Sequence, residues 1–172
     1  MNITLSEIKA NVDQLAARIS APQHTLPTYG FSEHNARPHV EVDTRGYHFV
    51  IAEREGELER HTTSDLNELL YKIFANVTFL LSSTYERAER TENHDPRKIT
   101  FRHQVELLTM LSPAWGERES QAHKQLLKQH PFDDYASARA ALSKDLREHS
   151  HSTEAAWMMA CAKYPLPKAP KG

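Results

Sequence analysis

The stretch RPHVEVDTRGYHFVIAEREGELERHTTSDLNELLYKIF, from Arg37 to Phe74, decides the fold of this 172-residue chain. Apolar and polar residues first alternate, which predicts strands, and then recur every three or four positions, which predicts a helix. The stretch is rich in carboxylates, yet it contains neither a nucleophile beside a base nor the ligand spacing of a metal site. This combination is typical of a surface that binds another molecule, not of a catalytic site.

The first part of this stretch predicts a small antiparallel sheet over residues 38–62. The segment Tyr47 to Arg54 is apolar on both faces, which is typical of a central strand. In the strand that follows, Glu57, Glu59 and His61 are expected to share one face because side chains alternate along a strand. A fourth short strand is a candidate near residues 28–31. The strands and turns of the predicted sheet are, in chain order, strand 39–42, turn 43–46, strand 47–54, turn 55–56 and strand 58–62.

The second part of the stretch predicts a long helix that forms the core with the central strand. Thr63-Ser64-Asp65 is a typical helix start, since short polar side chains cap the first free N–H groups. The residues expected to meet in the core are Leu69, Leu70, Ile73 and Phe74 from the helix and Phe49 and Ile51 from the strand. Four aromatic residues of the helix are also interpreted as core residues, namely Tyr71, Phe74, Phe79 and Tyr85.

The fold class that follows is α+β, in which the three-stranded sheet, or four-stranded with the candidate strand, packs on one long helix. Helix starts such as Asp95-Pro96 and Ser112-Pro113 predict additional helices in the C-terminal half. The length suits a single domain over residues 1–172. Within it, the predicted segments are an N-terminal helix at 1–20, the sheet at 38–62, the core helix at 64–90, helices at 96–148, a short helix at 153–162 and a flexible tail at 165–172.

Composition narrows the functions that the chain can have. The formal net charge of −2 and basic residues that are not interleaved with aromatic side chains argue against nucleic acid as a partner. No run of about 18 apolar residues is present, which argues against a membrane span, and the first residues lack the pattern of a secretory signal. We therefore expect a cytoplasmic protein, and the single cysteine, Cys161, fits a reducing compartment.

Neither a metal nor a cofactor is expected. The chain has eleven histidines, of which His123 and His130 could share a helix face, but they lack a third ligand. The five glycines form no phosphate-binding loop.

Charge is distributed unevenly along the chain. From Glu41 to Glu68 there are eight Asp and Glu against three Arg, whereas from Arg97 onward twelve Lys and Arg face eight Asp and Glu. An acidic sheet would attract a basic partner, although charge on an exposed strand also serves to prevent edge-to-edge pairing. The residues predicted to bind a partner are Glu41, Asp43, Glu53, Glu55, Glu57, Glu59, Arg60 and Asp65.

Two other functional classes stay open from the residues alone. A small cytoplasmic enzyme could use histidines together with Asp133 and Asp134, and would require a pocket in which such groups converge. A helical scaffold could form a homodimer through an apolar face that includes Trp157, Met158 and Met159.

The chain resembles the immunity protein 63 family of bacterial polymorphic toxin systems. The likeness covers residues 26–134 and is carried by three blocks: Arg37 to Arg54, Thr62 to Phe74, and HPFDD at His130 to Asp134. Between them, Val105 to Glu119 also resembles the family. The chain departs from the family pattern at residues 89–102, which are more polar, and it continues well beyond Asp134.

The resemblance implies a function in protein binding. Members of such families are non-enzymatic inhibitors, typically encoded beside a toxin that they bind and neutralise. The resemblance transfers no interface residues, so the acidic residues named above are the candidates. They would suit a toxin with a basic cleft, such as a nuclease, which needs positive charge to hold phosphates.

Overall fold

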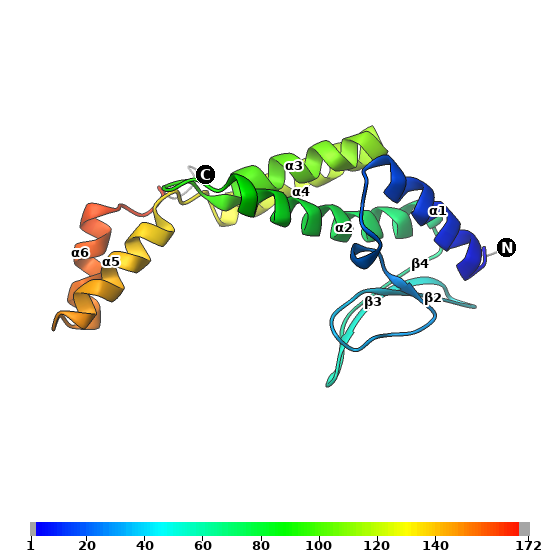
Figure 1. The fold of residues 1–172 in the computed structure, drawn as a ribbon, viewed down its shortest axis with the longest axis horizontal. Coiled ribbons are helices and arrows are strands. Elements are labelled where there is room, and N and C mark those ends of the chain that lie inside the picture. The colour runs from blue at the N-terminus through cyan, green and yellow to red at the C-terminus, as the bar shows by residue number, and fades with distance from the viewer. Residues whose placement is uncertain (1–2, 169–172) are drawn as a thin grey trace.

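The computed structural model describes residues 3–168, and it confirms the α+β class. A layer of helices forms the top of an arch, with a sheet beneath one end and a helical hairpin descending from the other (Figure 1). The elements are α1 (Leu5–Arg18), the 3-10 helix η1 (Gln23–Thr25), β1 (Thr28–Tyr29), β2 (His39–Asp43), β3 (Gly46–Glu53), β4 (Gly56–Thr63), α2 (Leu66–Glu89), α3 (Pro96–Leu111), α4 (Pro113–Gln129), α5 (Ala136–Glu148) and α6 (Thr153–Lys163).

The sheet has the strand order β1-β2-β3-β4, so β3 lies inside it, as its two apolar faces predicted. Strands β2, β3 and β4 pair antiparallel, which confirms the three predicted strands. The candidate fourth strand, β1, pairs parallel to β2, with Thr28 opposite His39, so the sheet is mixed instead of wholly antiparallel. The register of β3 with β4 shifts between Ile51 and Ala52, which marks a bulge.

The core lies where α2 crosses one face of the sheet. The carboxylate of Asp65 accepts a hydrogen bond from the backbone N–H of Asn67 and caps α2. The predicted core is confirmed: its four helix residues and Phe49 are buried, and Ile51 is partly buried beside them. Trp115 of α4 closes this core, with its ring stacked near that of Phe74.

Two of the aromatic residues assigned to the core lie at the surface. Tyr71 and Phe74 are buried, but Phe79 is 47% exposed and Tyr85 is 39% exposed. The interpretation was wrong for these two because Phe79 lines a hollow that is open to solvent, and Tyr85 lies at the surface, where its ring stacks on that of His103 of α3. Helix α2 runs along the helical layer beside α3 (Figure 1).

Helix α1 packs across the sheet and the helical layer. Thr4 and Glu7 form a capping box at the start of this helix, in which each side chain accepts a hydrogen bond from the backbone of the other. Arg18, at the other end of the helix, donates to the backbone carbonyls of Met110 and Leu111 at the end of α3. A cation at these free carbonyls is favourable, because they form the negative end of the helix dipole.

Helices α3 and α4 pack closely against each other and against α2. Asp95 caps α3 ahead of Pro96, as the Asp-Pro pair predicted. Pro113 likewise opens α4. Gly116 permits the close approach of α3 and α4, since a Cβ atom at this position would collide with the side chain of Thr109.

Helices α5 and α6 form a hairpin, which we call the arm, that extends away from the helical layer (Figure 1). Within the segment predicted to hold helices at 96–148, α5 begins at Ala136, after Asp133 and Asp134, whose side chains bind Arg139 and Lys98. The predicted tail at 165–172 lies outside the described residues from 169 onward. No helix of the described residues is long and apolar enough to cross a bilayer.

Candidate functional site

The predicted partner-binding residues lie on both faces of the sheet, not on one. Val40, Phe49 and His61 are opposite one another in the strand register, so they share the inner face, which packs on α2. Glu41 and Arg60 lie on the outer face, which faces away from α2, whereas Glu59 is on the inner face. The eight residues therefore do not form one acidic patch.

On the outer face, charges form a chain of ion pairs across three strands. Arg60 of β4 donates to Glu57 on its own strand and to Glu41 on β2, at 2.8 Å. Its side chain thus crosses β3, where Val50 is fully buried. The bonds from Arg60 lower the pKa of both Glu41 and Glu57, and His39 adds a contact to Glu41 at 3.1 Å. The negative charges of Glu41 and Glu57 are therefore largely balanced by Arg60 within the protein.

Asp43 and Asp65 have structural partners as well. Asp43 at the β2–β3 turn contacts the side chains of Arg45 and of the buried His48, and hydrogen bonds from both lower its pKa. His48 in turn contacts Thr62 at 2.8 Å, which ties the turn to β4. Asp65 caps α2. These contacts within the protein account for the positions of both aspartates, without a binding partner.

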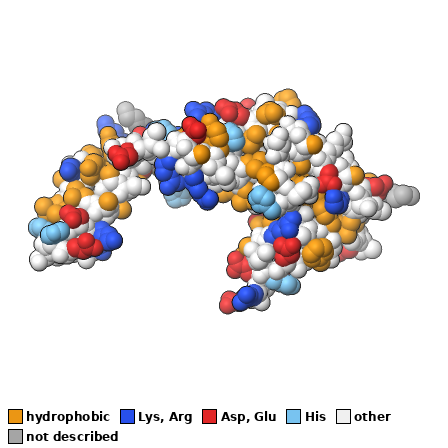
Figure 2. All heavy atoms as spheres, in the orientation of Figure 1, with side chains coloured by type: hydrophobic (Ala, Val, Ile, Leu, Met, Phe, Trp, Pro, Cys, Tyr) orange, Lys and Arg blue, Asp and Glu red, His pale blue; other side chains and the backbone are white. Residues whose placement is uncertain are grey.

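The β3–β4 turn carries acidic side chains whose charge is not balanced by an ion pair with another described residue. Glu53 and Glu55 are exposed, and neither makes an ion pair with another described residue. Arg54 lies between them, and Figure 2 shows acidic and basic side chains together at this tip of the sheet. The turn projects away from the core, so these side chains are accessible to a partner.

A groove that sequence reasoning missed lies between the sheet and the three long helices. It encloses about 430 Å³ and opens to solvent. Its described lining contains no serine, threonine or cysteine. The lining residues are Phe49, Glu59, Lys72, Ala75, Asn76, Phe79, Phe101, Gln104, Glu119, Ala122, His123 and Leu126.

Glu119 is the most enclosed carboxylate of the groove, with a side chain that is 13% exposed. It accepts a hydrogen bond of 2.6 Å from the hydroxyl of Tyr71, and the Nε2 atom of His123 lies 3.2 Å away. Burial raises the pKa of Glu119, but the hydrogen bonds from His123 and Tyr71 outweigh it and leave the pKa below its ordinary value. Glu119 is therefore ionised at neutral pH.

The remaining polar groups of the groove come from different elements. Lys72 of α2 pairs with Glu59 of β4 at 2.6 Å. Gln104 of α3 donates to the carbonyl of Ala75, while its buried Oε1 atom has no hydrogen-bond partner among the described residues. His123 stacks on the ring of Phe101, with the ring centroids 3.9 Å apart.

The sequence did contain signals for this groove. Glu119 and His123 are four positions apart, a spacing that brings two side chains together on a helix. Phe79 does not lie on the face of α2 that carries the buried residues. His130, considered with His123 as a metal ligand, lies at the end of α4 and does not line the groove. Among residues 3–168, no three side chains are arranged to hold a metal ion.

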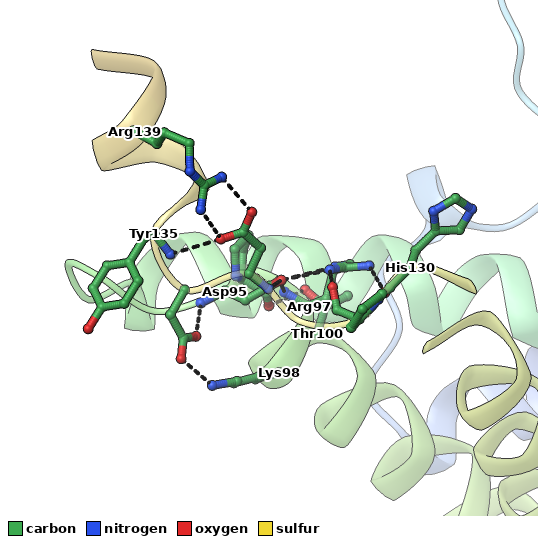
Figure 3. Close-up of polar contacts among 11 residues, drawn as sticks. Asp95, Arg97, Lys98, Thr100, His130, Tyr135 and Arg139 are labelled. Carbon is green, nitrogen blue, oxygen red and sulfur yellow. Dashed lines mark hydrogen bonds and ion pairs between the residues drawn. The ribbon is translucent and has the colours of Figure 1, made fainter. Parts of the chain in front are cut away.

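The two aspartates proposed for an enzyme take part in a structural cluster, which we call the clamp: Asp95, Asp133, Asp134 and Arg139 (Figure 3). Arg139, which is 2% exposed, forms a two-bond ion pair with Asp133. Asp95 accepts from the backbone N–H of Asp133, and Asp134 pairs with Lys98 at 2.7 Å. The cluster connects the start of α3 to the arm.

The clamp does not have the electrostatics of a general acid. Hydrogen bonds from Arg139 lower the pKa of Asp133, and bonds from Lys98 lower that of Asp134. A catalytic acid requires a raised pKa. Both carboxylates stay ionised, which suits their role in holding the arm.

Comparison with known proteins identifies the central part of the chain. Residues 43–125 match the family model described as Immunity protein 63. Over these residues the chain is similar to that family. The result confirms the resemblance, although the matched part is shorter than residues 26–134 and does not include the HPFDD block.

The region that matches the family model spans the elements that form the groove, from the end of β2 into α4. All groove residues except Leu126 lie within it. Helix α1 and the arm lie outside it. No curated protein and no solved structure matches the chain.

Proposed function

We propose that this protein binds a cognate bacterial toxin stoichiometrically, neutralises it and so protects the producing cell. The family match over residues 43–125 carries the proposal, because an immunity family implies a non-enzymatic inhibitor. The toxin gene is expected to neighbour the gene of this chain, and the proposed site of action is the cytoplasm.

We place the toxin-binding surface at β4 and the β3–β4 turn. Glu53 and Glu55 at the turn are exposed and uncompensated, and β4 is an edge strand of the sheet. Glu57 lies on the outer face of this strand and Glu59 on the inner face, so acids flank the edge on both sides. Such a surface would attract a toxin with a basic cleft, for example a nuclease.

Co-expression tests the proposal directly. The C-terminal region of the neighbouring gene product is expressed in a bacterial host with and without this chain. We expect the region to stop growth alone, and the chain to restore growth and co-purify with it at a fixed ratio. A harmless neighbour that does not bind would overturn the proposal and shift attention to the enzyme alternative, in which His123 and Glu119 would be the first residues to test.

Charge reversal at the turn should slow complex formation. In the Glu53→Lys, Glu55→Lys double variant, long-range attraction to a basic toxin is lost, and we expect the association rate constant at low salt to fall about tenfold. Stopped-flow or surface-binding kinetics at two salt concentrations measure it. The matched control is Glu148→Lys, Glu154→Lys on the arm. Equal slowing in both variants would show that net charge, not the turn, steers association.

A second candidate function, dimerisation through the arm, is favoured by the surface of α6. Only Ala156 and Ala160 of this helix are buried, whereas Trp157, Met158 and Met159 are exposed. A helix that is apolar on all sides is typical of burial by more than one neighbour. A second copy of the hairpin would supply the missing neighbours in a four-helix bundle.

Met158 tests this dimer, since its side chain is 66% exposed. At tens of micromolar, we expect light scattering after gel filtration to give twice the 19.7 kDa mass of one chain. Met158→Glu should give one chain, because a carboxylate cannot be buried unpaired in the new core. Lys144→Glu on α5 is the control. A monomeric wild type at this concentration would exclude the arm as a dimer interface.

A further inference from the structure

We infer that the groove between β4, α2, α3 and α4 is the pocket that receives an arginine side chain of the toxin. The inference rests on the proposed function and adds the chemistry of the contact.

The walls of the groove suit an apolar stem. Phe79 of α2 and Leu126 of α4 are both large, apolar and partly exposed, and they line the same hollow together with Phe101. Covering such side chains with the methylene groups of a partner is favourable. A long side chain with an apolar stem and a polar end matches these walls.

The charge of the groove selects a cation as the polar end. Glu119 is ionised and mostly buried, yet its ion-pair contact in the structure is to the imidazole of His123, not to a lysine or arginine. Its other contact is the hydroxyl of Tyr71. Arg118 acts on Glu119 through a coulombic interaction but forms no ion pair with it, so a guanidinium that enters the groove gains a charge-assisted contact that Glu119 otherwise lacks.

Hydrogen bonding favours arginine over lysine. Besides Glu119, the groove presents the Oε1 atom of Gln104, which has no donor among the described residues, and the carboxylate of Glu59, which is paired with Lys72 at 2.6 Å. Arginine carries five N–H donors in a plane, whereas the ammonium of lysine is compact. The planar group can also lie against an aromatic wall, as Arg118 already does on Tyr71, 3.7 Å from the ring centroid.

The position of the groove agrees with the proposed surface. Glu59 lines the groove from β4, the strand whose other face carries Glu57 and whose turn carries Glu55. One loop of a toxin could therefore contact the acidic turn and insert an arginine beside Glu59. Because the three acids belong to one strand and its turn, the two contacts can form together.

A small-molecule titration tests the groove without the toxin. N-acetyl-arginine-N-methylamide is added to the isotope-labelled full chain, and backbone amide shifts are followed by NMR. We expect saturable shifts at Phe79, Gln104 and Leu126, with a Kd of about 1–10 mM for so small a ligand. The uncharged norleucine analogue should give shifts that do not saturate. Equal responses to both probes, or none to either, would overturn the inference.

Variants separate the charge of the groove from its folding. Glu119→Gln should abolish saturation by the arginine probe, whereas Glu117→Gln, on the exposed side of the same helix, should not. Leu126→Lys keeps the partners of Glu119 but adds an internal ammonium at the rim, and it should also block the probe. Thermal unfolding confirms that each variant is folded. Unchanged binding in both Glu119→Gln and Leu126→Lys would show that the probe binds elsewhere.

The toxin then distinguishes failure of the inference from failure of the proposed function. With the cognate toxin, Glu119→Gln should weaken binding at least about 30-fold, the usual loss when one partner of a buried charge pair is removed. Glu117→Gln should bind as the wild type does. Tight binding by Glu119→Gln would reject the groove and leave toxin neutralisation standing, whereas absence of binding by the wild type would reject the proposed function itself.

Discussion

Phe74→Ala is expected to lower the free energy of unfolding by about 3–5 kcal/mol, whereas Phe79→Ala on the same helix should lower it by less than about 1 kcal/mol. Phe74 is fully buried and stacks near Trp115, so its removal leaves a cavity that α2, α4 and the sheet cannot fill. Phe79 lines the open groove, where water replaces the lost ring.

Urea unfolding followed by circular dichroism measures both variants, with the slope of the transition used to confirm that the same surface unfolds. The pair is matched in chemistry and in helix, so the difference reports burial alone. Comparable losses would mean that α2 does not pack with Phe74 inward. Phe79→Ala has a second use, because it should keep the fold while removing one wall of the proposed arginine pocket.

Sequence reasoning located the core because its signals are local. The capping residues Thr4 and Asp65 mark helix starts, and their side chains act within three positions. The two-sided apolar pattern of β3 predicted its place inside the sheet. Burial of Phe74 against Phe49 then followed, since the long helix must cover the sheet.

The distribution of the acidic residues was harder to predict, because it depends on register. Glu57 and Glu59 were expected on one face, but the bulge opposite Ile51 and Ala52 inserts a residue into β4 and separates them. Glu57 consequently pairs with Arg60, while Glu59 pairs with Lys72. A count of acids in the sequence could not show which of them are already compensated.

The groove and the clamp depend on contacts between distant parts of the chain. The groove requires β4, α2, α3 and α4 to converge, and no single segment carries that pattern. An aspartate just before a helical segment, such as Asp133, is typical of a helix cap. The spacing in the sequence does not distinguish this capping role from the ion pair that Asp133 forms with Arg139. Helix α5 instead begins later, once the aspartates have bound their partners.

Asp133→Asn is the variant expected to release the arm. Arg139 is buried, and besides Asp133 it donates to the backbone carbonyls of Tyr164 and Pro165. Removal of the carboxylate leaves a buried guanidinium without its charge partner, which typically costs about 3–5 kcal/mol. Because α5 packs mainly on α6, we expect this loss to fall on the arm and not on the core.

Amide hydrogen exchange distinguishes local release from global unfolding. Protection of α5 and α6 should fall by orders of magnitude in Asp133→Asn, while protection of α2 stays unchanged. Asp145→Asn, an exposed carboxylate on α5, is the control and should leave the arm protected. Loss of protection in α2 as well would show that the arm and the core unfold as one unit.

Acid should have the same effect as the Asp133→Asn variant. Hydrogen bonds from Arg139 lower the pKa of Asp133 below its unfolded value of about 3.9. The ion pair therefore stabilises the arm fully when the pH is above the pKa of Asp133 in the unfolded chain. This stabilisation is lost as the pH falls through the lower pKa that Asp133 has in the folded protein. We expect wild-type arm protection to decline below about pH 4 and the decline to be weaker in Asp133→Asn, because its amide does not titrate. An equally steep acid response in the variant would assign the pH dependence to Asp95 and Asp134, whose pKa values are also lowered in the clamp.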